Sequence, residues 1–438
     1  YRKIIGGKVF GGPMYYLQEG FKERDMAGLG KVLGVFFAVM CVGAALGGGN
    51  MYQANQSGQQ LLGVVESDEH IRAQDAHDEA KKELAKLQQI GSETDEVKER
   101  VEKLSAEVEK TKRFDWQLGD TSELLRQAEA RLEMESQNLS GQSPQILAVA
   151  KKVTETHEKM EDTKGFFSKQ RWVFGLVLAI AVGLVIIGGI TSIASVTARL
   201  VPAMTVIYIT GCLVVLIANI QAVPDAFESI ISKAFEPMSA AGGFMGAFIM
   251  GIRRAAFSNE AGFGSAPIAH AAVKTRYPAS EGLVALLEPM MDTIVVCTMT
   301  GLAIVVTAES HGYVAGEGGV QLTSAAFETV IPWFQYILLV CVILFAFSTM
   351  ISWSYYGQQA WSFLFGRGKG VEIVYKVLFC TFIIIGASLS LGQVMRFSDG
   401  MLFAMSLFNL IGVYALLPVV KRELTNYNEH MQRIDRDE

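Results

Sequence analysis

The stretch from Ser258 to His270, SNEAGFGSAPIAH, places polar and flexible residues between two long apolar runs. Glycine and serine are poor helix formers, and the proline at position 267 removes a backbone donor. Inside a bilayer, backbone without helical hydrogen bonds persists only where it lines a cavity or binds something. Its free amides can receive a carboxylate, and its free carbonyls can receive a cation at the ends of two half-helices. The pattern predicts a helix that is unwound at residues 257–267 and binds a small solute together with a cation.

A kinked helix whose glycines allow close packing is the alternative interpretation of this stretch. The side chains of Ser258, Asn259, Glu260 and Ser265 argue against it, because helix packing alone does not need so many donors and acceptors. We therefore expect a binding site.

Three further polar groups interrupt apolar runs. Asn50, Gln53 and Asn55 lie close together, Glu288 and Asp292 share a helix face, and Ser348 and Thr349 precede Trp353 by about one turn. Adjacent hydroxyl groups are hard oxygen ligands of the kind that suits sodium. An acid inside a membrane is by default a functional hypothesis, whereas amides often only hold helices together, so both interpretations stay open for the amides.

Long apolar runs must position these residues. Hydrophobic residues make up 50% of the 438 residues and charged residues 19%, below the roughly 25% of soluble domains. Each run reaches or approaches the length of about 20 residues that a spanning helix needs. The sequence predicts an all-α polytopic membrane protein with eight spanning segments, at residues 30–62, 172–192, 199–221, 239–273, 281–307, 325–362, 371–392 and 399–420.

The segment 64–171 has a different composition. Residues 66–170 hold 24 acidic and 17 basic residues, a net charge of −7, against −6 for the whole chain. Val97, Val101, Leu104 and Val108 follow a short heptad spacing. We expect a charged helical hairpin or coiled coil that acts as a spacer or docks a protein partner, with a ligand-sensing domain as the alternative.

The remaining composition favours no catalytic or nucleic-acid function. The five cysteines all lie in apolar runs, and the six histidines lack metal-ligand spacing. Basic residues do not cluster with aromatic ones, and no nucleophile has an adjacent base. We expect neither an enzyme nor a cofactor.

Basic residues in the short loops predict the orientation. They place residues 1–30, 192–200, 273–281, 363–371 and the tail 421–438 in the cytoplasm, and the insert 64–171 outside the cell. The chain begins with Tyr1 rather than methionine, so we expect residues to precede it.

Six motifs together resemble, in order and spacing, the alanine or glycine:cation symporter family, also called the sodium:alanine symporters. They are GGPMYYL, GNMYQAN, SNEAGFGSAPIAHAAVKT, DTIVVCTMT, LTSAAF and LFAFSTMISWSYYG. The resemblance implies the inverted-repeat fold of the amino acid, polyamine and organocation transporters. It also implies that the first two core helices would precede Tyr1 and are absent from this sequence.

The resemblance implies roles for individual residues. The substrate-binding residues would be Asn50, Gln53, Asn259, Gly262, Gly264, Ser265 and Trp353. Sodium would bind at Ser348 and Thr349, with Asp292 at a second cation site.

The expected function is import of a small neutral amino acid, alanine or glycine, coupled to sodium or protons by alternating access. The alternative is a membrane receptor or scaffold whose outer helical arm binds a protein partner. The domains would be residues 1–63, the insert 64–171, seven spanning segments in 172–420 and the tail 421–438, in the cell (inner) membrane.

Overall fold

The structure is a computed structural model, and it falls into two compact units. One unit comprises Tyr1–Val64 and Arg171–Glu438, and the other comprises Val65–Gln170. The residues that it describes are 1–5, 8–65, 76, 77, 79–81, 83, 144–163, 169–234, 244–311 and 320–437.

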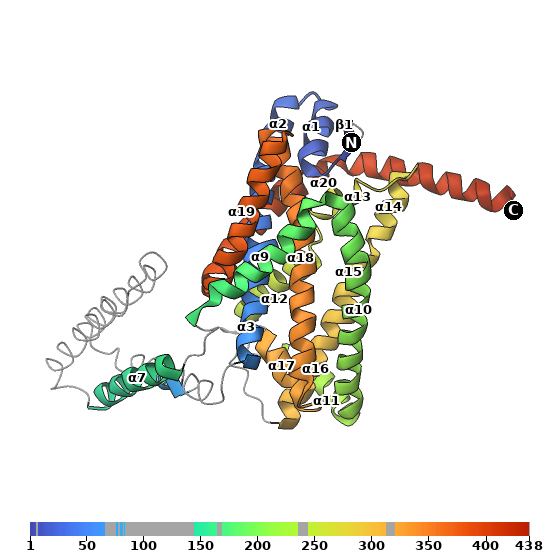
Figure 1. Ribbon diagram of the computed structural model, residues 1–438. Helices are drawn as coiled ribbons and strands as arrows, with labels where there is room; N and C mark the ends of the chain where they lie inside the picture. Colours follow the sequence, from blue (N-terminus) through green and yellow to red (C-terminus); the bar gives the residue numbers. More distant parts are fainter. Residues whose placement is uncertain are drawn as a thin grey trace. The chain divides into compact units, whose positions relative to one another are not determined.

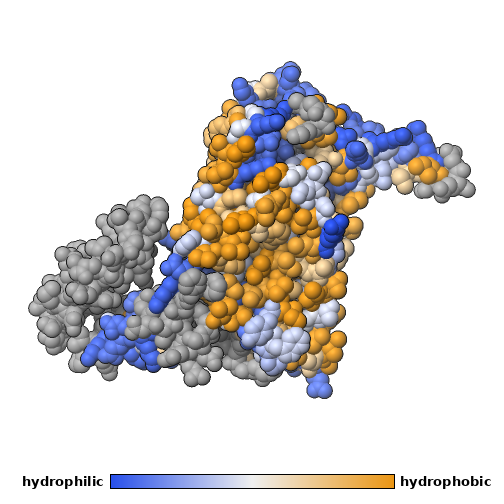
Figure 2. Space-filling view, in the orientation of Figure 1, coloured by the Kyte–Doolittle hydropathy of each residue, from blue (hydrophilic) through white to orange (hydrophobic). Residues whose placement is uncertain are grey.

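The larger unit is a helical bundle built for a bilayer. Among the described residues, six helices are long and apolar enough to cross a membrane: Ala27–Val65, Gly189–Ala218, Pro278–Ala308, Phe334–Phe365, Lys369–Ser388 and Leu391–Ile434. A seventh apolar helix, α9 (Arg171–Ile187), is shorter. Figure 2 shows apolar residues covering the visible face around α10, α16 and α18, with hydrophilic residues gathered near α1 and the end of α20. The chain is therefore an all-α polytopic membrane protein.

The N-terminal residues, which we expected on the cytoplasmic side, form regular secondary structure. Strands β1 (Lys3–Ile5) and β2 (Lys8–Phe10) pair antiparallel, and helix α1 (Pro13–Lys22) follows. Gly12 precedes α1 with a φ of 107°, and Pro13 occupies the first helical turn, where its missing N–H is not needed. The GGP sequence thus begins a helix.

The first spanning helix contains an irregular turn. Helix α2 (Ala27–Leu46) continues through the π-helical turn η1 (Gly47–Met51) into α3 (Tyr52–Val65). Helix α2 packs against α1, α18 and α20, while η1 also contacts α19 (Figure 1). The turn η1 therefore lies inside the bundle, and all five of its residues are buried.

The boundary between the next two segments differs from the prediction. We expected a cytoplasmic loop at residues 192–200, but these residues are helical, since α10 runs from Gly189 to Ala218. The chain instead breaks at Gly188, where α9 has ended and Gly189 has a φ of 69°. The short elements η3 (Ile220–Ala222) and α11 (Val223–Ala234) follow.

The second half of the bundle contains several interrupted helices. Helices α12 (Phe244–Asn259) and α13 (Ala266–His270) are separated by a break, and the next span is divided into α14 (Pro278–Ala285), α15 (Leu287–Met290), the π-helical η5 (Met291–Cys297) and α16 (Thr298–His311). The segment that we predicted at 325–362 is two helices, α17 (Val320–Glu328) and α18 (Phe334–Phe365). Helices α19 (Lys369–Ser388) and α20 (Leu391–Asp437) end the chain, and α20 begins before residue 399 and continues through the tail beyond residue 420.

The smaller unit is described mainly by α7 (Pro144–Thr163). Within it, Lys152 forms an ion pair with Glu83 at 3.4 Å. The heptad residues from Val97 to Val108 lie outside the described residues, so the coiled coil stays a prediction.

Candidate functional site

The break between α12 and α13 is formed by left-handed backbone. Glu260, Gly262 and Gly264 have φ angles of 55°, 86° and 93°, which a right-handed helix cannot accommodate. Pro267 lies at the start of α13, where a missing donor costs no hydrogen bond. The glycines rather than the proline therefore unwind the helix, at residues 260–265 within the predicted range 257–267.

Neighbouring helices hold this break in place. The Asn409 side chain of α20 donates to the carbonyl of Gly262 at 2.7 Å, and the Tyr16 hydroxyl donates to Asn409. A Cβ atom at Gly264 would lie 2.6 Å from Pro13 and 2.9 Å from the ring of Phe37. The backbone at Gly264 therefore approaches the elements α1 and α2 so closely that only glycine fits.

The Glu260 side chain points from the break toward α18. One carboxylate oxygen accepts the indole N–H of Trp353 at 2.9 Å, and the other accepts the Ser265 hydroxyl at 2.6 Å. Trp353 is only 3% exposed and packs directly on Gly49 of η1, where a Cβ atom would collide with the indole. Glu260 and Trp353 thus connect the break, α18 and the π-helical turn of the first span.

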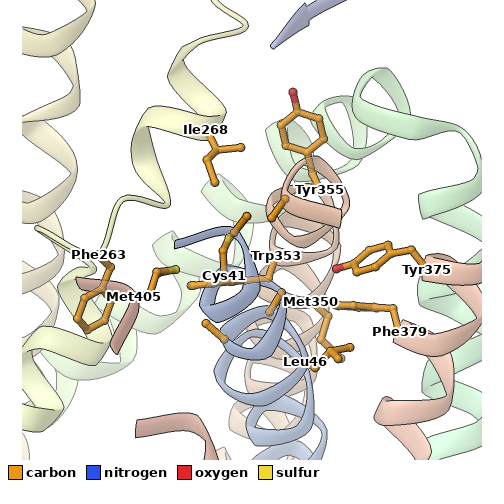
Figure 3. Close-up of a cluster of buried hydrophobic side chains, with 14 of the residues drawn as sticks. Cys41, Leu46, Phe263, Ile268, Met350, Trp353, Tyr355, Tyr375, Phe379 and Met405 are labelled. Carbon is orange, nitrogen blue, oxygen red and sulfur yellow. The ribbon is translucent and has the colours of Figure 1, made fainter. Parts of the chain in front are cut away.

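Figure 3 shows the apolar side chains around this connection. Cys41 and Trp353 lie next to each other, with Phe263 of the break on one side and Tyr375 of α19 on the other. All four belong to one buried cluster. The polar centre is therefore surrounded by apolar and aromatic groups, as is typical of small-molecule sites.

The two amides of the first span that we predicted as substrate-binding residues face different neighbours. Asn50 is fully buried and donates to the Phe379 carbonyl of α19 at 2.7 Å, while its own oxygen has no hydrogen-bond partner among the described residues. Gln53 donates to the Gly48 carbonyl at 3.1 Å, inside its own helix. The π-helical turn changes the helical register, so Asn50 faces α19 while the adjacent Gly49 contacts Trp353.

Asn259 and Asp292 lie on the side of the break that faces η5. Asn259 donates to the Thr293 hydroxyl at 2.7 Å, and Ser258 donates to both carboxylate oxygens of Asp292 at 3.0 and 2.9 Å. The structure therefore brings a predicted substrate residue, Asn259, beside the predicted second cation residue, Asp292.

The hydroxyl pair on α18 lies about one turn from Trp353. Ser348 is buried and donates to the Phe345 carbonyl of its own helix at 2.9 Å. Thr349 is half-buried, and its hydroxyl makes no hydrogen bond to any residue that the structure describes. The Thr349 oxygen is therefore free to bind a ligand.

An ion pair joins α12, the helix before the break, to α20. Arg254 of α12 contacts both oxygens of Asp399 on α20 at 2.5 and 2.7 Å, and its guanidinium lies 5.2 Å from the ring centre of Phe257. Nothing in the sequence pairs Arg254 with Asp399, because the two residues are 145 positions apart.

Sequence reasoning missed three residues of this site. Glu260 was recognised as polar but was not assigned a role, Gly49 was overlooked, and Asn409 was not considered. An acid inside an apolar run and three consecutive glycines at residues 47–49 were available signals. Nothing in the sequence pairs Asn409 with Gly262.

Comparison with known proteins gives a consistent result. The model of the sodium:alanine symporter family matches residues 1–74 and 145–438. The chain is 38% identical over 279 residues to a sodium/alanine symporter of Methanococcus maripaludis, covering 63% of this chain and 61% of that protein. It is 34% identical over 263 residues to a probable sodium/glutamine symporter of Bacillus subtilis, with 60% and 54% covered. An amino-acid carrier protein of Bacillus subtilis is 32% identical over 266 residues, with 60% and 56% covered, so the chain spans little more than half the length of these relatives.

Proposed function

The chain belongs to the sodium:alanine symporter family, and on that premise we propose that it imports a small neutral amino acid, alanine or glycine, together with sodium. Membership of this family supports a transport function rather than catalysis. The observation that carries the proposal is the left-handed break at residues 260–265, whose carboxylate is bonded to Trp353 of α18.

The break supports a transport function because it places polar groups inside the helical bundle. Gly262 and Gly264 hold the backbone in a left-handed conformation, and Ser265 and Trp353 place hydrogen-bond donors in apolar surroundings. We assign the substrate to these residues together with Asn50, Gln53 and Asn259. Trp353, seated on Gly49, would limit the size of the substrate side chain.

Sodium is assigned to Ser348 and Thr349, with Asp292 at a second cation site. The support is the Thr349 hydroxyl, which has no hydrogen-bond partner among the described residues, and the half-buried Asp292 carboxylate, which two hydrogen bonds from Ser258 orient. One sodium ion that moves inward gains about 2.3 kcal/mol per 100 mV, enough to concentrate a neutral amino acid roughly 40-fold.

The mechanism would be alternating access in an inverted-repeat fold. Residues 1–63 and 172–420 would form the transport unit in the cell membrane, the insert 64–171 would lie outside, and the tail 421–438 would be cytoplasmic. The insert would act as a spacer or bind a protein partner.

Uptake into liposomes tests the proposal. The purified protein is reconstituted, and uptake of labelled alanine, glycine and glutamine is compared under an inward sodium gradient, an inward proton gradient and no gradient. We expect sodium-driven accumulation of alanine or glycine, abolished by an ionophore that dissipates the sodium gradient. Accumulation driven only by protons would refute the sodium assignment, and no uptake by folded protein would favour the receptor or scaffold.

A further inference from the structure

Glu260 is the one acidic residue of the break, and among the residues that the structure describes its carboxylate has only neutral hydrogen-bond partners. Each oxygen accepts a single hydrogen bond, from Trp353 or from Ser265. Because a carboxylate can accept about four hydrogen bonds, each oxygen keeps a free lone pair.

The charge of Glu260 is not balanced by any described residue. The nearby ionisable groups that act on it, Glu288 and Asp292, are also acidic. By contrast, Asp399 of α20 forms an ion pair with Arg254 at 2.5 Å. A carboxylate in apolar surroundings is costly unless a positive group pairs with it. A cationic group brought by a ligand would balance this carboxylate.

We propose that Glu260 binds the α-ammonium group of the amino acid, which makes it the residue that requires an amino group in the substrate. The inference rests on the proposed function and adds a residue to its site. The carboxylate supplies the negative charge, and Trp353 and Ser265 fix its orientation through their hydrogen bonds.

The surroundings of Glu260 fit an ammonium group better than a sodium ion. Hard metal cations need several oxygen ligands at once. Around Glu260 the neighbouring groups are hydrogen-bond donors that point at the carboxylate, and the Gly262 carbonyl is already occupied by Asn409. An ammonium group needs only directed acceptors, and the free lone pairs of the Glu260 carboxylate are such acceptors.

Competition binding on the unmodified protein provides the first test. Labelled alanine is bound to purified protein in sodium buffer and displaced by propionate, which lacks the ammonium group, or by ethylamine, which lacks the carboxylate. We expect ethylamine to displace alanine at lower concentration than propionate does. If propionate is the better competitor, the inference is overturned.

Variants provide the second test. Glu260→Gln keeps the shape but removes the charge, and we expect alanine affinity to fall by at least about 30-fold. Glu260→Asp keeps the charge and should bind alanine more tightly than Glu260→Gln does. The control is Glu328→Gln on α17, which should leave alanine affinity unchanged, because among the described residues this carboxylate accepts only the Ser324 hydroxyl.

The outcomes separate this inference from the proposed function. Alanine affinity within about threefold of the unmodified protein in Glu260→Gln would overturn it. The inference is also overturned if Glu260→Gln binds alanine as tightly as the unmodified protein but its sodium or pH dependence is altered, because the carboxylate would then serve the coupling cation. If Glu260→Gln does not fold, the competition series on the unmodified protein still tests the inference, which is overturned if propionate is the better competitor. Amino acid binding without any sodium dependence would refute the proposed coupling and leave the role of Glu260 intact.

Discussion

At the scale of single residues, the site depends on which polar atoms meet. The sequence shows that Glu260, Ser265 and Trp353 interrupt apolar runs, but Glu260 and Trp353 are 93 positions apart. Their pairing follows from the packing of α18 against η1 and the break, which no local pattern contains. The types of the site residues could therefore be predicted, whereas their partners could not.

The Trp353 indole N–H is the first contact to test. Trp353→Phe keeps a ring on Gly49 but removes the donor to Glu260, and a hydrogen bond to a charged group contributes about 1.5–3 kcal/mol. We expect the affinity for alanine to fall by about tenfold or more in equilibrium binding. Trp361→Phe is the matched control, because Trp361 lies on the same helix and donates to the Val371 carbonyl instead. Equal losses in both variants would contradict a specific role for Trp353.

The Thr349 hydroxyl is expected to act on sodium rather than on the amino acid. Thr349→Val removes the oxygen and leaves the branched shape, so the sodium concentration for half-maximal uptake should rise by about tenfold. Uptake at saturating sodium should stay near that of the unmodified protein. Thr381→Val on α19 is the control, since that hydroxyl donates to the Val377 carbonyl of its own helix. An unchanged sodium requirement in Thr349→Val would remove this residue from the cation site.

At the scale of elements, hydropathy predicts where the chain crosses the membrane better than it predicts where helices begin and end. The apolar runs correspond to helices, but Arg199 suggested a loop where α10 is continuous, and the actual break at Gly188 and Gly189 carries no charge. The π-helical turn η1 could not be predicted either, because its three glycines are as compatible with a regular, closely packed α-helix as with a π-helical turn. The break at residues 260–265 could be predicted, since glycine, serine and asparagine accumulate there.

Gly264 tests the conformation of the break. Gly264→Ala would place a Cβ atom at a φ of 93° and 2.6 Å from Pro13, at a cost of at least about 1–3 kcal/mol. We expect a lower melting temperature of the purified protein together with weaker alanine binding. Gly282→Ala, in helix α14 with open space around the new methyl group, should be neutral. A stable Gly264→Ala variant would mean that the backbone at this position is not left-handed.

At the scale of the whole molecule, the six long apolar helices and the family together establish a multi-pass membrane protein. The predicted orientation in the membrane rests on the basic residues of the short loops. The predicted role of the insert rests on its charge and length. The side of the membrane that each loop faces is therefore a matter for experiment.

Cysteine labelling tests the orientation. In a variant with its five cysteines replaced by serine, Glu155→Cys on α7 should react with an impermeant maleimide in intact cells. Gly368→Cys, between α18 and α19, should react only after the membrane is permeabilised. The reverse pattern would invert the proposed topology.

The central claim is that sodium and a small amino acid bind together around the interrupted helix. Equilibrium titration of the purified protein with alanine at several sodium concentrations, and with sodium at several alanine concentrations, tests this claim most directly. We expect sodium to tighten alanine binding and alanine to tighten sodium binding by the same factor, because coupling free energy is reciprocal. An alanine dissociation constant that stays the same from zero to saturating sodium would contradict the account.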